Sequence, residues 1–164
     1  CLVAAGLVFT AGIAAGSALS LALSCDLVLA GPRASFCAIF ARRGHAVDSG
    51  TSWLLPRLVG ERRARELILL GEPIDAEQAL AWGMITALAS DADVEQVVAS
   101  YVARARAISP IAHRANRRLL ARTWERTLSQ ALDDEAETQL EVLRSDRTHA
   151  TLGAFTDRRR ETST

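Results

Sequence analysis

The sequence predicts an α/β fold, in which a layered parallel sheet is followed by a helical C-terminal region. Apolar runs at 2–10 and 26–30 enclose a stretch of small residues and leucines at 17–24. This strand–helix–strand order is typical of a parallel sheet with buried strands. From Gly50 onward, apolar residues recur at three- and four-residue spacing, which indicates helices. We therefore expect two regions, at 1–90 and 91–164.

Each expected element follows from local spacing and from its end residues. In the first region we expect strands at 2–10, 26–30 and 35–37, a turn at 12–16, and a helix at 17–24. From Gly50 onward we expect helices at 51–58, 61–70, 76–82, 93–108, 110–124, 127–144 and 148–159, with a short strand at 84–88. Asp75 can cap the third of these helices, and Pro110 suits a first helical position.

Composition excludes several classes of protein. The 164 residues carry no formal net charge, so nothing directs the chain toward nucleic acid or an anionic membrane. Three cysteines without paired spacing do not make a disulfide framework, which fits the cytoplasm. The uncharged stretch 2–23 is long enough to span a bilayer, but small residues interrupt it and no basic segment precedes it. We expect a buried strand, turn and helix there, and no membrane span.

One ordered set of motifs carries the functional information. Gly12-Ile13-Ala14-Ala15-Gly16-Ser17-Ala18 is followed by Cys25-Asp26, and later by Val47-Asp48-Ser49-Gly50 and Trp53-Leu54-Leu55-Pro56-Arg57. This order resembles the crotonase (enoyl-CoA hydratase/isomerase) superfamily, and most of all its phenylacetyl-CoA ring-epoxide isomerases. The resemblance implies a crotonase-like (ClpP/crotonase) fold whose C-terminal helices form trimers. It also implies further residues before Gly12, so we expect the chain to be N-terminally truncated.

The resemblance gives two residues a catalytic role. The backbone N–H of Ser17 matches a donor to the oxyanion that forms on a thioester oxygen. Asp48 matches a position at which some family isomerases and dehalogenases carry a catalytic aspartate. Each residue has a structural alternative: the small residues around Ser17 would merely allow close packing, and Asp48 would merely cap a helix.

Hydration by two glutamates is not expected. The two positions that carry these glutamates in the family's hydratases match Ser20 and Phe40, and neither side chain can act as a general base or acid at neutral pH. We therefore favour an isomerase over a hydratase. His45 is interpreted as a loop residue, and no cluster of ligands has metal-binding spacing.

The resemblance also implies how coenzyme A is held. Arg114, Arg118 and Phe155 match the basic and aromatic residues of the C-terminal helices that contact the nucleotide. The alternative is a solvated basic face that pairs with the acidic run 133–135. Coenzyme A enters as part of an acyl-CoA substrate, and no separate cofactor is expected. We expect a homo-trimer or hexamer, and the alternative function is a truncated, non-catalytic assembly module.

Overall fold

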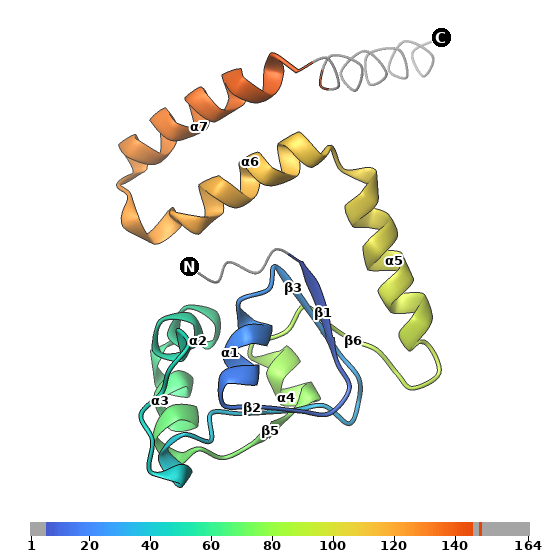
Figure 1. Cartoon of the computed structure of the whole chain (residues 1–164), viewed down its shortest axis with the longest axis vertical. Coiled ribbons are helices and arrows are strands. Elements are labelled where there is room, and N and C mark those ends of the chain that lie inside the picture. The colour runs from blue at the N-terminus through green and yellow to red at the C-terminus, as the bar shows by residue number, and fades with distance from the viewer. Residues whose placement is uncertain (1–5, 146–147, 149–164) are drawn as a thin grey trace. The chain divides into compact units, whose positions relative to one another are not determined.

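The computed structural model describes residues 6–145 and 148 and divides the chain into two compact units, residues 1–102 and 103–164 (Figure 1). Helix α5 (Val94–Ala107) contains the boundary between these units. The expected division into regions 1–90 and 91–164 stays a prediction, since contact clusters do not establish which parts fold independently.

The first unit contains both strands and helices. In chain order it contains β1 (Leu7–Thr10), β2 (Ile13–Ala15), α1 (Ser17–Leu23), β3 (Leu27–Ala30), β4 (Ser35–Cys37), the 3-10 helix η1 (Ala41–Arg43), α2 (Thr51–Val59), α3 (Glu61–Leu70), β5 (Ile74–Asp75), α4 (Ala76–Ala81) and β6 (Ala87–Leu88). The predicted strands at 26–30 and 35–37 and the helices at 17–24, 51–58 and 61–70 are confirmed, with ends that agree within two residues.

The described strands form two three-stranded sheets. The first has the order β1-β3-β6 and is wholly parallel, with Val8 opposite Val28 and Leu29 opposite Ala87. In the second sheet, β2 is parallel to β4, while β4 is antiparallel to β5. Helix α4 contacts strands of both sheets, and α1 contacts β2. The predicted layered, mainly parallel α/β arrangement is therefore confirmed.

Two short strands differ from the prediction. The segment 12–16 was predicted as a turn, but its middle is β2, paired residue for residue with β4. Strand β5 was not predicted at all; its Ile74 is 7% exposed and pairs with Phe36. Both strands depend on partners distant in sequence, and pairing of this kind outweighs weak local preference.

Buried side chains from α1, both sheets and α2 make one core. Leu19, Ala30, Phe36 and Leu55 are each 1% exposed or less. Burying a large apolar side chain contributes about 1.5–3 kcal/mol to folding, so this core holds α1 and α2 against each other. Their N-terminal ends are therefore fixed within the same core.

The second unit contains two helices that pack against each other, α6 (Pro110–Ala121) and α7 (Leu128–Leu143), joined through the 3-10 helix η2 (Thr123–Glu125). Pro110 occupies the start of α6, as predicted. Thr127 and Gln130 form a reciprocal capping box at the start of α7. The predicted helix at 148–159 lies almost wholly outside the described residues. None of the helices that the structure describes is long and apolar enough to cross a membrane.

Candidate active site

A glycine turn places the first N–H groups of α1. Gly16 has φ 58° and ψ −130°, a conformation that favours glycine, and its N–H donates to the carbonyl oxygen of Cys37 over 3.0 Å. The N–H groups of Leu19 and Ser20 donate to the Gly16 carbonyl. The N–H of Ser17 belongs to the first helical turn and donates to no acceptor within residues 6–145. It is therefore available to a bound oxyanion.

The Asp48 segment leads into α2 through left-handed backbone. Ser49 has φ 50° and Gly50 has φ 87°. The backbone N–H and the hydroxyl of Thr51 both donate to the Asp48 carbonyl, over 2.9 and 2.8 Å. Gly50 is the N-cap residue of α2, with no side-chain hydrogen bond at the cap. The Asp48 carboxylate is thus not used to cap this helix.

The structure brings the two predicted catalytic residues together. The Ser17 hydroxyl donates to Oδ1 of Asp48 over 3.0 Å, although the residues are 31 positions apart. Both side chains are exposed. A carboxylate that can accept a proton therefore lies beside a free backbone N–H at the start of a helix, where the helix dipole favours negative charge.

The two positions that carry glutamates in hydratases are buried. Ser20 is 1% exposed, and its hydroxyl is hydrogen-bonded to that of Thr51. Phe40 is 7% exposed, and its ring lies 3.9 Å from where a side chain on Gly16 would begin. Within this chain, neither residue supplies an acidic group to the site.

Sequence reasoning missed Thr51. This threonine is fully buried and connects Ser20 to the Asp48 carbonyl. The only available signal was a matched spacing, since the residues of each pair, Ser17 with Ser20 and Asp48 with Thr51, are three positions apart.

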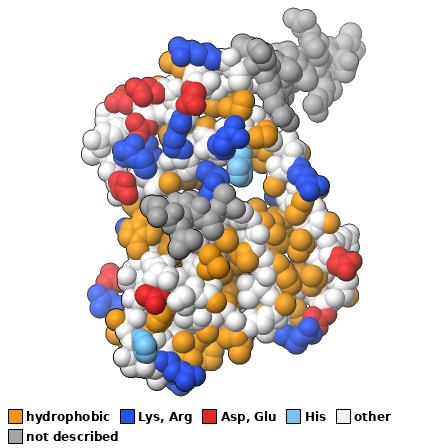
Figure 2. Space-filling model, in the orientation of Figure 1, with side chains coloured by type: hydrophobic (Ala, Val, Ile, Leu, Met, Phe, Trp, Pro, Cys, Tyr) orange, Lys and Arg blue, Asp and Glu red, His pale blue; other side chains and the backbone are white. Residues whose placement is uncertain are grey.

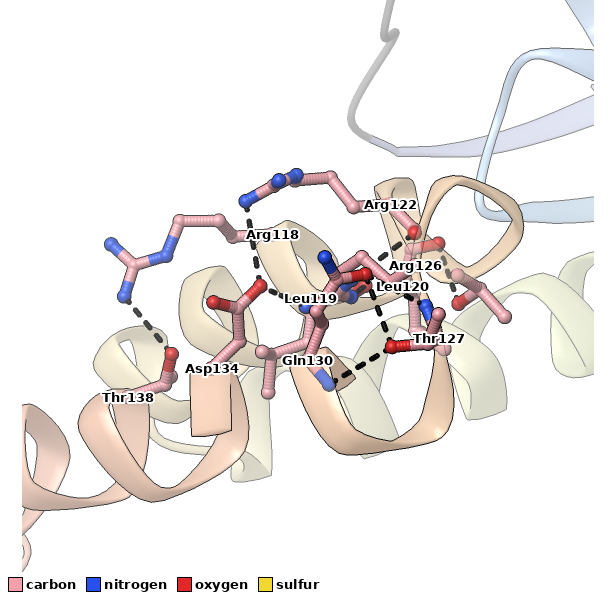
Figure 3. A network of polar contacts seen from close by, with 10 residues as sticks. Arg118, Leu119, Leu120, Arg122, Arg126, Thr127, Gln130, Asp134 and Thr138 are labelled. Atoms are coloured by element: carbon pink, nitrogen blue, oxygen red, sulfur yellow. Dashed lines mark hydrogen bonds and ion pairs between the residues drawn. The ribbon is translucent and has the colours of Figure 1, made fainter. Parts of the chain in front are cut away.

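The residues predicted to contact coenzyme A differ from one another in their surroundings. Arg118 forms an ion pair with Glu141 over 2.5 Å and points toward Thr138 (Figure 3). Arg114 is exposed and has no ion pair among the residues described. Phe155 lies outside the described residues. Arg114 and Arg118 belong to the second unit, whereas Ser17 and Asp48 belong to the first.

The two arginines that flank η2 pair with the acidic run. Arg122 and Arg126 both contact the Asp134 carboxylate, and Arg126 also donates to the carbonyls of Leu119 and Arg122 (Figure 3). The side chain of Arg126 is only 6% exposed. These contacts join the residues around η2 to α6 and α7.

The remaining titratable groups that the structure describes give no second site. His45 is exposed. Cys25 and Cys37 are free thiols; burial raises the pKa of each, Asp26 adds to the rise for Cys25, and Arg42 opposes it for Cys37. Across the described residues, no group of three histidine, cysteine, aspartate or glutamate side chains is arranged to hold a metal ion.

The sequence is similar to a known protein family and to individual proteins of that family. A family model described as enoyl-CoA hydratase/isomerase matches residues 6–162. The 1,2-epoxyphenylacetyl-CoA isomerase of Escherichia coli K12 is 44% identical over 95 residues, which are 56% of this chain and 36% of that protein.

Solved structures match the fold over most of the chain. An enoyl-CoA hydratase from Polaromonas sp. JS666 has a TM-score of 0.83 at 31% identity, covering 90% of this chain and 57% of that one. A Thermobifida fusca YX protein solved in complex with acetoacetyl-CoA has a TM-score of 0.78 at 31% identity, covering 82% and 54%. The predicted crotonase-like fold is confirmed, and the chain spans little more than half the length of these structures.

Proposed function

The chain belongs to the enoyl-CoA hydratase/isomerase family, and we propose that it moves a proton on an acyl-CoA thioester. The observation that carries this proposal is the 3.0 Å hydrogen bond between the Ser17 hydroxyl and Asp48 Oδ1. This hydrogen bond connects the glycine turn, where the Ser17 backbone N–H is free within residues 6–145, to the Asp48 carboxylate. The substrate class is supported by two relatives, since one is named for an acyl-CoA substrate and another was solved with acetoacetyl-CoA.

Two groups share the chemistry. Asp48 takes the proton from the carbon next to the thioester carbonyl, and the electron pair of the broken C–H bond moves onto the thioester oxygen. The Ser17 N–H donates a hydrogen bond to this oxyanion, with the positive end of the helix dipole behind it. Return of the proton to another carbon shifts the double bond, so no other reactant is required.

Isomerisation is favoured over hydration. Hydration of an enoyl-CoA needs groups that activate water and protonate the carbon skeleton. Ser20 is buried and bonded to Thr51, and Phe40 is an apolar side chain against the glycine turn. Asp48 is the acidic residue that remains close to Ser17, which supports a one-carboxylate proton shuttle.

We assign coenzyme A binding to Arg114, Arg118 and Phe155. A guanidinium group binds phosphate through charge-assisted hydrogen bonds. Arg114 is exposed with no ion pair in the described residues, so it would contact phosphate without first losing a carboxylate partner. Arg118 would have to exchange Glu141 for the phosphate. Phe155 is proposed from its sequence position alone. Coenzyme A is part of the substrate in this proposal, and no further cofactor is invoked.

A second candidate is a non-catalytic assembly module. The observation that favours it is the exposure of both Ser17 and Asp48. An oxyanion contact is strong in a site that excludes water, and it weakens where water competes for the same donor. A chain with this exposed pair and no turnover would be an acyl-CoA or protein-binding module.

Self-association is also proposed, as the homo-trimer or hexamer that the family resemblance implies. Figure 2 shows hydrophobic side chains gathered in patches on the surface of the molecule. The described part of the second unit exposes a set of large apolar side chains, each at least 55% exposed: Leu120, Trp124, Leu128, Leu132 and Leu140. Apolar surface of this kind promotes association.

We place the protein in the cytoplasm, which the free thiols Cys25 and Cys37 support.

The proposal is tested by incubating the purified chain with a 3-enoyl-CoA in deuterium oxide. We expect a 2-enoyl product with deuterium at C4, the carbon to which the proton returns, and deuterium at C2 of recovered substrate where proton removal is reversed, measured by mass spectrometry and NMR. Accumulation of a 3-hydroxyacyl-CoA would show hydration and contradict the isomerase assignment. Binding of acyl-CoA without exchange or turnover would support the non-catalytic module instead.

A further inference from the structure

Two hydroxyl contacts join α1 to the Asp48 segment in matching register. Ser17 and Ser20 lie one helical turn apart on α1, and they contact Asp48 and Thr51, which are also three positions apart. The Ser17–Asp48 contact is exposed, whereas the Ser20–Thr51 contact is buried. The buried contact therefore anchors the exposed one.

The buried Ser20–Thr51 hydrogen bond lets the exposed Ser17–Asp48 hydrogen bond hold its side chains better than an ordinary surface hydrogen bond does. An isolated hydrogen bond at the surface contributes little, because water offers the same partners and holding two free side chains costs entropy. Here the buried Thr51 hydroxyl bonds both Ser20 and the Asp48 carbonyl. The backbone of Asp48 is therefore already fixed relative to α1, and only the last side-chain torsions remain to be ordered.

We propose that the Ser17 side chain is a positioning residue for Asp48, separate from the role of the Ser17 backbone N–H. By donating to Oδ1, the hydroxyl holds the carboxylate beside the glycine turn. Oδ2 has no hydrogen-bond partner in the described part of the chain, so it is the oxygen left to take the substrate proton. This inference rests on the proposed function, in which Asp48 is the proton acceptor.

Turnover of Ser17 variants tests the inference. Ser17→Ala keeps the backbone N–H but loses the hydroxyl, so we expect kcat to fall roughly tenfold while KM changes less than about twofold, since misorientation of a reacting group lowers the chemical step. Ser17→Thr keeps a hydroxyl and should recover most of kcat. Ser24→Ala is the matched control, because the Ser24 hydroxyl bonds the Leu21 carbonyl at the other end of α1.

A second measurement does not depend on turnover. The 13C resonance of the Asp48 carboxyl carbon reports its hydrogen bonding, and it should shift in Ser17→Ala and stay unchanged in Ser24→Ala. The two measurements separate the inference from the proposed function. A parent chain without turnover contradicts the proposed function, and the carboxyl resonance then decides whether Ser17 orients Asp48. An unchanged resonance in Ser17→Ala, or a kcat equal to that of the parent, overturns the positioning role.

Discussion

The hydroxyl of Ser20 donates a hydrogen bond to the hydroxyl of Thr51 inside the core. The direction follows from the neighbouring bond: Thr51 uses its single hydroxyl proton to bond the Asp48 carbonyl, so it can only accept from Ser20. Ser20 and Thr51 are 1% and 0% exposed. This buried pair fixes the start of α2 against α1, and with it the backbone that carries Asp48.

Replacement of Thr51 should therefore destabilise the chain. Thr51→Val keeps the shape of the side chain but leaves the Ser20 hydroxyl without a partner, which costs about 1–3 kcal/mol. Urea denaturation should show this loss, and Thr51→Ser should show less of it. The double variant Ser20→Ala, Thr51→Val removes both hydroxyls and should lose less stability than the sum of the two single variants. A Thr51→Val variant as stable as the parent would contradict this account.

Gly16→Ala should disturb the turn at the start of α1. The φ of 58° with ψ −130° is strained for any residue with a side chain, so we expect a loss of about 1–3 kcal/mol. Gly12→Ala is the matched control, because its φ is not positive and a methyl group there meets nothing within 4 Å. Thermal unfolding of both variants checks the prediction, and equal melting temperatures would count against it.

In the second unit, Arg126 should contribute more to folding stability than Arg118. Arg126→Met removes a guanidinium that is 6% exposed and leaves Asp134 and the Leu119 carbonyl without it, so we expect a loss of about 2–4 kcal/mol. Arg118→Met breaks an ion pair whose arginine side chain is 57% exposed, and a loss of about 0–1 kcal/mol follows. Hydrogen exchange in α7 measures the difference. Equal protection in the two variants would be the contrary result.

Stability should fall at alkaline pH because of the thiols. Burial raises the pKa of Cys37 in the folded chain, although Arg42 partly offsets this rise. Above about pH 8.5 the unfolded thiol ionises while the folded one stays neutral, so the stabilisation present below that pH is lost as pH rises toward the folded pKa. The free energy of unfolding measured from pH 7 to 9.5 should therefore fall less steeply in Cys37→Ala than in the parent. Equal slopes would contradict this assignment.

Periodic helices and cap residues were predictable from the sequence because their signals are local. Helix α3 ends at Gly71, which has the left-handed backbone typical of a helix end, and Asp75 accepts a hydrogen bond from the Gln78 N–H, as a capping aspartate does. Strands β2 and β5 were not predictable, since three or two residues form a strand only when a distant partner is present.

The candidate site was predictable only in part. The types and order of residues pointed to Ser17 and Asp48, but a resemblance gives no distance between side chains. The buried role of Thr51 and the ion pair of Arg126 with Asp134 depend on burial and on contacts across 31 and 8 positions. A three-residue spacing within each segment does not show that these contacts form.

The central claim is that Asp48 carries the proton, and Asp48→Asn tests it most directly. Asparagine keeps the size of the side chain and can still accept from the Ser17 hydroxyl, but it cannot act as the base. Asp133→Asn is the matched control, since Asp133 is an exposed residue of α7. We measure deuterium exchange next to the thioester of an acyl-CoA. The account predicts that exchange by Asp48→Asn falls at least about a hundredfold, the lower range for loss of a general base, while Asp133→Asn exchanges like the parent. Exchange at the parental rate in Asp48→Asn would contradict it.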